Sequence, residues 1–260
     1  MTISTSIHSS ALVSPKAELG NNVSVGPFSI IEENVCIGDN TSIGNHTTIK
    51  AETTIGNNGK IFHNCSIGET PQDLKFSGEK TTTHIGNNVI IRESVTINRG
   101  TSARGTTEIG NDVLLMACTH VAHDCVVENH VIMANLATLG GHVELGKHVS
   151  LGGGVLVHQF SKIGDYVFIG GGFRVVQDVP PYILGAGEPL KFAGVNQIGL
   201  RRCGFDSKTR SLIKEAYRMY FRSDNLNRKE ALNKIKFDIE NIDEIKTIVN
   251  FIETSERGII

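Results

Sequence analysis

The sequence predicts an all-β solenoid of short parallel strands followed by a helical C-terminal region. A six-residue repeat carries this prediction: of the 29 positions reached in steps of six from Ile7 to Val175, 26 hold Ile, Leu, Val or Met. A second register, four residues later, holds small or β-branched residues. Neither a helix nor simple alternation sustains a period of six. We therefore expect a parallel β-helix with three short strands in each 18-residue coil.

Two interruptions of the repeat preserve its phase, so they predict loops that leave the coils rather than domain boundaries. They are "ETPQDLKFSGEKTTTH" at 69–84 and "GTSARGTTE" at 100–108. The three positions that break the apolar register, Asp73, Glu79 and Ala103, fall inside them.

The repeat stops after Val175, and a segment rich in Pro and Gly follows. We therefore expect a β-helix domain over 1–180 and a mainly α-helical C-terminal extension over 181–260. Asp206 or Ser207 can cap a helix that runs to about Phe221, and further helical patterns cover 227–240 and 243–254.

Composition excludes several classes of function. The formal net charge is −2, so nothing global favours nucleic acid or a membrane surface. The N-terminus lacks the basic and apolar regions of a signal peptide, and no apolar run approaches the ~20 residues of a membrane helix. Five cysteines without a CxxC pair are typical of free thiols in a reducing compartment. We expect a cytoplasmic protein in which Cys65 and Cys125, in the small inward register, are packing residues.

Stacking of the coils gathers histidines that the sequence scatters. Residues 18 apart stack at about 4.8 Å, so His123 lies over Gly141 and Asp124 over His142, with Gln159 and His158 in the next coil. The expected edge therefore carries the following side chains: His120, His123, Asp124, His142, His158 and Gln159.

Two chemistries compete for this edge. Several imidazoles can hold zinc with one position left for water, as in the gamma-type carbonic anhydrases, which share this repeat. Alternatively, one imidazole oriented by a carboxylate acts as a general base on a hydroxyl. The adjacent His123 and Asp124 favour the second chemistry. Gly140 and Gly141 also fit it, because a glycine lets a carbonyl approach the backbone and offers its N–H to an oxyanion.

The motifs together resemble a known family. The hexapeptide repeats, "IGETPQDLKF", "IRESVTINRGT", "HVAHDC", "GGHV", "VHQF", "QDVPPY" and "GVNQIGLRRCGF" are similar, in this order, to the UDP-N-acetylglucosamine O-acyltransferases that begin lipid A biosynthesis. The resemblance runs over nearly the whole chain.

The resemblance implies a left-handed β-helix, a rare exception to right-handed crossovers, and a homotrimer with active sites between subunits. It implies transfer of an (R)-3-hydroxyacyl group from acyl carrier protein to the 3-hydroxyl of UDP-N-acetylglucosamine, with no cofactor and no metal. His123 would be the general base, Asp124 its orienting partner, and the Gly141 N–H the oxyanion donor.

Further roles follow from matching the family's motifs. Residues implied to contact the substrates are Asp73, Lys75, His120, His142, His158, Gln159, Asn196 and Arg202. Residues implied to set acyl-chain length are Phe168, Gly171 and Pro189. The chain departs from the family at Ile198, where an acidic residue is common, and at Cys203, where a second Arg is common. These departures leave open the nucleotide contacts and the choice between N-acetylglucosamine and a 3-amino analogue.

The predicted C-terminal helix carries a basic stripe with a spacing of four, formed by Arg210, Lys214, Arg218 and Arg222. It is either a solvated face or a docking site for the acidic acyl carrier protein. Three rival functions also remain: a sister N-acyltransferase, which usually has an extra N-terminal domain, a zinc-dependent hydratase, and a non-catalytic scaffold.

Overall fold

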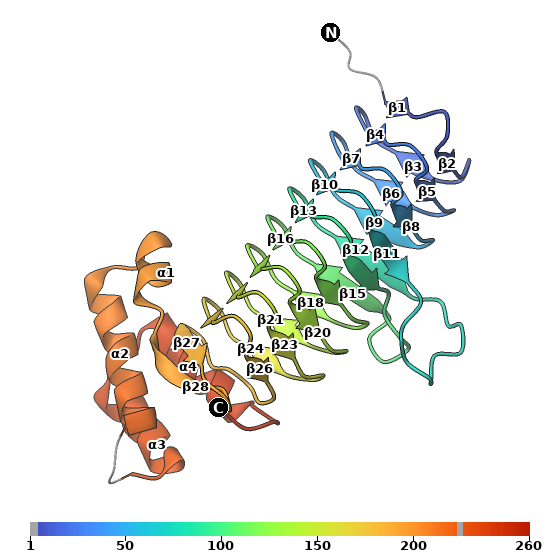
Figure 1. The fold of residues 1–260 in the computed structure, drawn as a ribbon. Helices are drawn as coiled ribbons and strands as arrows, with labels where there is room; N and C mark the ends of the chain where they lie inside the picture. Colours follow the sequence, from blue (N-terminus) through green and yellow to red (C-terminus); the bar gives the residue numbers. More distant parts are fainter. Residues whose placement is uncertain (1–4, 223–225) are drawn as a thin grey trace.

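The computed structural model describes residues 5–222 and 226–260. A long parallel β-helix fills most of the chain, and helices gather at its C-terminal end (Figure 1). The predicted fold class, a left-handed parallel β-helix followed by a helical region, is confirmed. None of the helices in the described residues has both the length and the apolar character needed to cross a membrane.

Three sheets form the sides of the β-helix. The first sheet contains β1 (Ser6–Ile7), β4 (Ser24–Val25), β7 (Ser42–Ile43), β10 (Lys60–Ile61), β13 (Ile90–Ile91), β16 (Leu114–Leu115), β19 (Ile132–Met133), β22 (Ser150–Leu151), β25 (Phe168–Ile169), β27 (Ile183–Ala186) and β28 (Lys191–Val195). The second contains β2 (Leu12–Val13), β5 (Ile30–Ile31), β8 (Thr48–Ile49), β11 (Ser66–Glu69), β14 (Thr96–Asn98), β17 (His120–Val121), β20 (Thr138–Leu139), β23 (Leu156–Val157) and β26 (Arg174–Val175). The third contains β3 (Glu18–Leu19), β6 (Cys36–Ile37), β9 (Thr53–Ile55), β12 (Thr82–Ile85), β15 (Thr106–Ile109), β18 (Val126–Val127), β21 (Glu144–Leu145) and β24 (Lys162–Ile163).

The six-residue repeat corresponds directly to this architecture. Val121 pairs with Leu139, and Leu139 pairs with Val157, so successive strands of one sheet are 18 residues apart. Where the repeat is interrupted the separation grows, and Lys60 pairs with Ile90. Both interruptions are therefore loops that leave intact coils, as predicted.

The interior is a continuous column of aliphatic side chains. The repeat residues point inward, and those of the central coils, such as Ile97, Val121 and Leu139, are completely buried. Each is covered by the coils on both sides, which is how a solenoid builds a core from units that cannot bury their own faces. Cys65 and Cys125 are buried in this column, and burial raises the pKa of these thiols to about 11 and about 12.

The corners of the coils need a left-handed backbone. A residue with φ near +60° recurs about every six positions, for example Asn34, Asn40, Asp124 and His142. Asn, Asp and His tolerate this conformation better than most residues. Asn34, Asp124 and His142 lie at the corner between the second and third sheets, so the polar side chains there have a local reason, before any function is considered.

In the part of the C-terminal region that the structure describes, a hairpin is combined with four helices. Strand β27 pairs in parallel with β25 and antiparallel with β28, which extends the first sheet. The helices are α1 (Gln197–Arg202), α2 (Ser207–Arg222), α3 (Arg228–Asp238) and α4 (Asp243–Glu253). The last three confirm the predicted helices, and the Asp206 side chain caps α2 by accepting the Thr209 N–H at 2.7 Å. The hairpin and α1 were missed, because their Pro and Gly content indicates only a turn-rich exit.

Candidate active site

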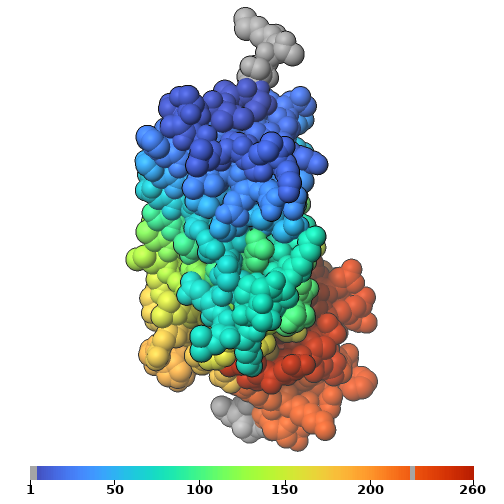
Figure 2. All heavy atoms as spheres, turned by 90° about the vertical axis from the view of Figure 1, so that its right-hand side faces the viewer, coloured from blue at the N-terminus to red at the C-terminus, as the bar shows by residue number. Residues whose placement is uncertain are grey.

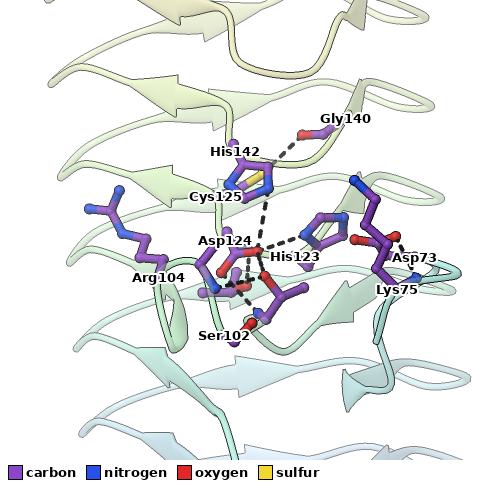
Figure 3. A network of polar contacts seen from close by, with 12 residues as sticks. Asp73, Lys75, Ser102, Arg104, His123, Asp124, Cys125, Gly140 and His142 are labelled. Atoms are coloured by element: carbon purple, nitrogen blue, oxygen red, sulfur yellow. Dashed lines mark hydrogen bonds and ion pairs between the residues drawn. The ribbon is translucent and has the colours of Figure 1, made fainter. Parts of the chain in front are cut away.

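His123 and Asp124 occupy the turn between β17 and β18 (Figure 3). Asp124 has φ of 60° and a completely buried side chain, with 0% of its surface exposed. Its own N–H donates to the Thr107 hydroxyl at 2.8 Å, which fixes the turn to the third sheet. A carboxyl group is thus held inside the protein at a corner whose geometry the repeat determines.

Three donors surround the Asp124 carboxylate. Thr101 donates its N–H to Oδ1 at 2.9 Å and its hydroxyl to Oδ2 at 2.7 Å. The Nδ1 atom of His123 lies 2.7 Å from Oδ2. Burial raises the pKa of Asp124, but the hydrogen bonds from His123 and Thr101, together with the nearby His142, outweigh burial and lower the pKa below its usual 3.8. Asp124 is therefore ionised at neutral pH.

An ionised partner determines the tautomer of His123. A carboxylate only accepts hydrogen bonds, so Nδ1 of His123 carries the proton and donates it, and the neutral ring has its lone pair on Nε2. The ring lies against the backbone of Gly141: a Cβ at that position would be 2.6 Å from Cε1 and 2.7 Å from Nε2. Only glycine fits there, which confirms the predicted stacking of His123 and Gly141.

His142, one coil further on, lies beside both His123 and Asp124 (Figure 3). Its Nε2 is 3.6 Å from Asp124 Oδ2, its ring meets that of His123 edge-on at 5.1 Å, and it stacks on Phe160 at 4.4 Å. Burial lowers the pKa of His142 and outweighs the opposing effect of Asp124. A neutral imidazole therefore stands beside the buried carboxylate.

A cavity of about 640 Å³ opens beside these residues. Its walls come from the two loops that interrupt the repeat, and Ser102 joins them by donating its N–H to Glu79 Oε1 at 3.2 Å. Figure 2 shows these loops, in teal and green, protruding from one face of the β-helix. The cavity is lined by Gln72, Asp73, Leu74, Lys75, Phe76, Glu79, Thr101, Ser102, Ala103, His123, His142, Gln159 and Phe160.

Not every predicted residue joins this cavity. Asp73, Lys75, His123, His142 and Gln159 line it together, and Figure 3 shows His123 between Asp124 and the loop that carries Asp73 and Lys75.

The two remaining histidines of the predicted edge have other neighbours. His120 lies on the outer face of the second sheet, with Nδ1 2.7 Å from the Thr96 hydroxyl. His158 lies near the C-terminal segment, where its Nδ1 is 3.3 Å from Nη2 of Arg257. Of the four histidines expected at this edge, His123 and His142 line the cavity within one chain, and His120 and His158 do not.

A second cavity, of about 430 Å³, lies against the first sheet and α1. It brings together Phe168, Asn196 and Arg202, and also the two departures Ile198 and Cys203.

Asn196 also stabilises the second cavity. Its side chain accepts the Gly199 N–H and donates to the Tyr166 carbonyl at 2.9 Å, and so caps α1.

The other two residues expected to set acyl-chain length lie near this end of the β-helix. Gly171 is stacked on Gly153 at the corner between the first and second sheets. Pro189 lies in the turn between β27 and β28.

Several residues of the site were not predicted from the sequence, and two of them, Thr101 and Phe160, contact Asp124 and His142 directly. Phe160 lies 18 residues after His142, so the repeat itself could have found it. Thr101 belongs to a loop, where the repeat gives no position, and only the folded structure brings it to Asp124.

A metal site is the alternative use of these residues. His123, Asp124 and His142 each offer a ligand atom, and all three atoms lie within 4.8 Å of one another. Both oxygens of Asp124, however, already accept hydrogen bonds, two from Thr101 and one from His123. Both lone pairs of Oδ2 are used, by the Thr101 hydroxyl and by His123, so a metal ion at this oxygen would have to displace one of them, and the geometry fits an imidazole–carboxylate pair better than a ligand set.

The β-helix and this pair define a transferase of the hexapeptide-repeat class. A family profile described as bacterial transferase hexapeptide (six repeats) matches residues 16–51, and one described as UDP-N-acetylglucosamine O-acyltransferase, domain 2, matches residues 178–260.

Relatives define the family more closely. The chain is 46% identical over 255 residues (98% of each chain) to the acyl-(acyl-carrier-protein)–UDP-N-acetylglucosamine O-acyltransferase of Thiobacillus denitrificans. It is 48% identical over 254 residues to the protein of that name from Thermodesulfovibrio yellowstonii, covering 97% of this chain and 98% of the relative. The crystal structure of a UDP-N-acetylglucosamine acyltransferase from Bacteroides fragilis superposes with a TM-score of 0.95 at 45% identity, over 97% of this chain and 99% of that one. The chain belongs to the acyl-(acyl-carrier-protein)–UDP-N-acetylglucosamine O-acyltransferase family.

The charge of Asp124 predicts a pH-dependent contribution to stability. Because its folded pKa lies below 3.8, the stabilisation is complete above that pH and is lost as the pH falls through the folded pKa. We expect Asp124→Asn to lower the free energy of unfolding by about 2 kcal/mol at pH 7. The difference from wild type should shrink below about pH 4, as measured by urea unfolding at several pH values.

The exposed Asp112 supplies the control, and Asp112→Asn should change stability little at any of these pH values. A difference between Asp124→Asn and wild type that stays constant or grows in acid would contradict the assigned charge.

Proposed function

We infer that this chain is an acyltransferase that moves an (R)-3-hydroxyacyl group from acyl carrier protein to the 3-hydroxyl of UDP-N-acetylglucosamine. The observation that carries this proposal is the His123–Asp124 pair at the wall of a cavity large enough for a sugar nucleotide. The relatives' names specify the donor and the acceptor. This reaction is the first step of lipid A biosynthesis.

The pair acts as a general base and then as a general acid. Nε2 of His123 takes the proton of the sugar hydroxyl while the hydroxyl oxygen attacks the carbonyl carbon of the thioester. The imidazolium formed on His123 is stabilised by the ionised Asp124. When the tetrahedral intermediate collapses, the C–S bond breaks and the leaving thiolate takes the proton back from His123. The acyl group passes directly to the sugar, and neither a metal nor an acyl-enzyme is needed.

The Gly141 N–H is well placed to hold the oxyanion. At the same position of turns between the third and first sheets, the N–H of Asn111 donates to Asn129 Oδ1 at 2.7 Å and that of Lys147 to Asp165 Oδ1 at 2.8 Å. At the corner where Gly141 lies, the Ala51 N–H donates to Glu32 Oε2 at 3.0 Å. The N–H at this turn position therefore binds an oxygen that a neighbouring coil supplies. Among the described residues, nothing accepts a hydrogen bond from Gly141, so its N–H can serve a substrate oxygen instead.

The other cavity residues serve the substrates. Lys75 and Asp73, on the loop, supply a positive charge and hydrogen-bonding groups for the sugar nucleotide. His142 and Gln159 border the position of the thioester. His120, on the coil of His123, and His158, on the coil of Gln159, flank this region and contact the parts of the substrates that extend beyond it.

The two cavities support a homotrimer with active sites between subunits. In one chain the catalytic pair lies at the corner between the second and third sheets, whereas Asn196, Arg202 and Phe168 lie against the first sheet. Leu74, at the tip of the cavity loop, is completely exposed, as expected of a side chain that contacts a neighbouring copy. Arg202 and Asn196 of one subunit then bind the nucleotide beside His123 of the next.

The residues expected to measure the acyl chain fit the same arrangement. Phe168 presents an aromatic ring to the second cavity. Gly171 leaves its corner open, and Pro189 lies on the adjoining hairpin. The acyl chain extends from the thioester along this surface, where these three residues determine its length.

The donor's protein part meets the C-terminal helices. Lys214, Arg218 and Arg222 of α2 line one groove together with Phe192 and Gly194. A basic groove with an apolar wall suits an acidic helical partner, so the basic stripe docks acyl carrier protein.

Replacement of the base tests the reaction. We expect His123→Ala to lower transfer of a labelled 3-hydroxyacyl group to UDP-N-acetylglucosamine by about 10³-fold or more, with the β-helix intact. Wild-type activity should persist in the presence of a chelator. The control is His63→Ala, which removes an exposed histidine from the same position of another turn. Near-normal transfer by His123→Ala would remove His123 from the mechanism, and chelator-sensitive activity would favour a metal.

Mixed oligomers test the intersubunit site. His123→Ala and Arg202→Ala should each be nearly inactive alone. When the two are unfolded and refolded together, about one quarter of sites should combine an intact His123 with an intact Arg202 from a neighbour. Activity of the mixture should rise accordingly. A mixture no more active than its components would show that each site is built within one chain.

A further inference from the structure

The hydroxyl and the amide of Thr101 hold both oxygens of the buried Asp124 carboxylate. We propose that Thr101 is a positioning residue that directs this carboxylate to His123 and so fixes the proton of His123 on Nδ1. The inference rests on the proposed role of His123 as the base.

The direction of the Thr101 hydroxyl follows from its second contact. The Ala103 N–H donates to Thr101 Oγ1 at 3.2 Å, so this oxygen already acts as an acceptor. A hydroxyl has one proton to give, and Oδ2 of Asp124 lies 2.7 Å away. The proton therefore points at the carboxylate, which receives donors from Thr101 on one side and from His123 on the other.

Two imidazoles compete for the same oxygen. Oδ2 of Asp124 lies 2.7 Å from His123 Nδ1 and 3.6 Å from His142 Nε2. His142 is therefore the alternative partner of this oxygen. Because the N–H of Thr101 holds Oδ1 and its hydroxyl holds Oδ2, the plane of the carboxylate is fixed, and His123 keeps the shorter bond.

The loop that carries Thr101 also connects the Asp124 carboxylate to the loop that bears Asp73 and Lys75. The Gly105 N–H donates to the Thr101 carbonyl at 2.7 Å, which closes the loop. The next residue, Ser102, donates to Glu79 on the loop that bears Asp73 and Lys75. Thr101 thus links the two walls of the cavity to the orientation of the base.

Removal of the hydroxyl at constant size tests the proposal. We expect Thr101→Val to lower kcat by about 10- to 100-fold, with KM for UDP-N-acetylglucosamine changed by less than about twofold. Thr101→Ser, which keeps the donor, should restore most of the activity. The control is Thr53→Val, since Thr53 lies two coils away in the column of Thr83 and Thr107. Its hydroxyl is buried without a hydrogen-bond partner among the described residues.

A double-mutant cycle separates positioning from a general structural effect. If Thr101 acts through Asp124, adding Thr101→Val to Asp124→Asn should lower kcat by less than about twofold further. Equal losses in both backgrounds, full activity of Thr101→Val, or failure of Thr101→Ser to restore activity would overturn the inference. Absence of transfer by the wild-type enzyme would instead overturn the proposed function, and this inference with it.

Discussion

The backbone pairing of residues one coil apart is the constraint on which the rest of the structure depends. Val121 pairs with Leu139 and Leu139 with Val157, so every turn is placed above the turn before it. This stacking sets His123 against Gly141 and Asp124 beside His142. His123, Asp124 and His142 thus need no long-range packing of separate domains, because a repeating hydrogen-bond pattern already brings these three residues together.

Burial of the Asp124 carboxylate is unfavourable in free energy, and hydrogen bonds from a loop and from the turn offset this cost. Asp124 has no exposed surface, and an unpaired charge there would be strongly destabilising. The loop after β14 supplies Thr101, and the turn itself supplies His123. The insertions that interrupt the repeat therefore build the cavity, and the second of them also supplies hydrogen bonds to the buried Asp124 carboxylate.

The sequence predicts the features that follow from the repeat and from helix capping, but few of the side-chain contacts and loop positions. The coils, the stacking of His123 on Gly141, and helices α2 to α4 follow from periodicity and capping. His120 and His158 lie near the correct edge, but their contacts with Thr96 and Arg257 depend on side-chain direction, which the period does not specify. Thr101 could not be placed because it belongs to a loop. Asn196 and Arg202 line a second cavity but lie beyond the repeat, so the period gives neither residue a position.

The proposed role of His123 requires that the ionised Asp124 hold the proton of His123 on Nδ1 and leave Nε2 free to accept one. Nitrogen-15 NMR of the imidazoles in the intact protein, with His123 assigned by its loss in His123→Ala, measures this directly. At a pH where His123 is neutral, we expect a protonated Nδ1 and an unprotonated Nε2. A proton on Nε2, or an equal mixture of the two tautomers, would contradict the account, because Nε2 could not then act as the base.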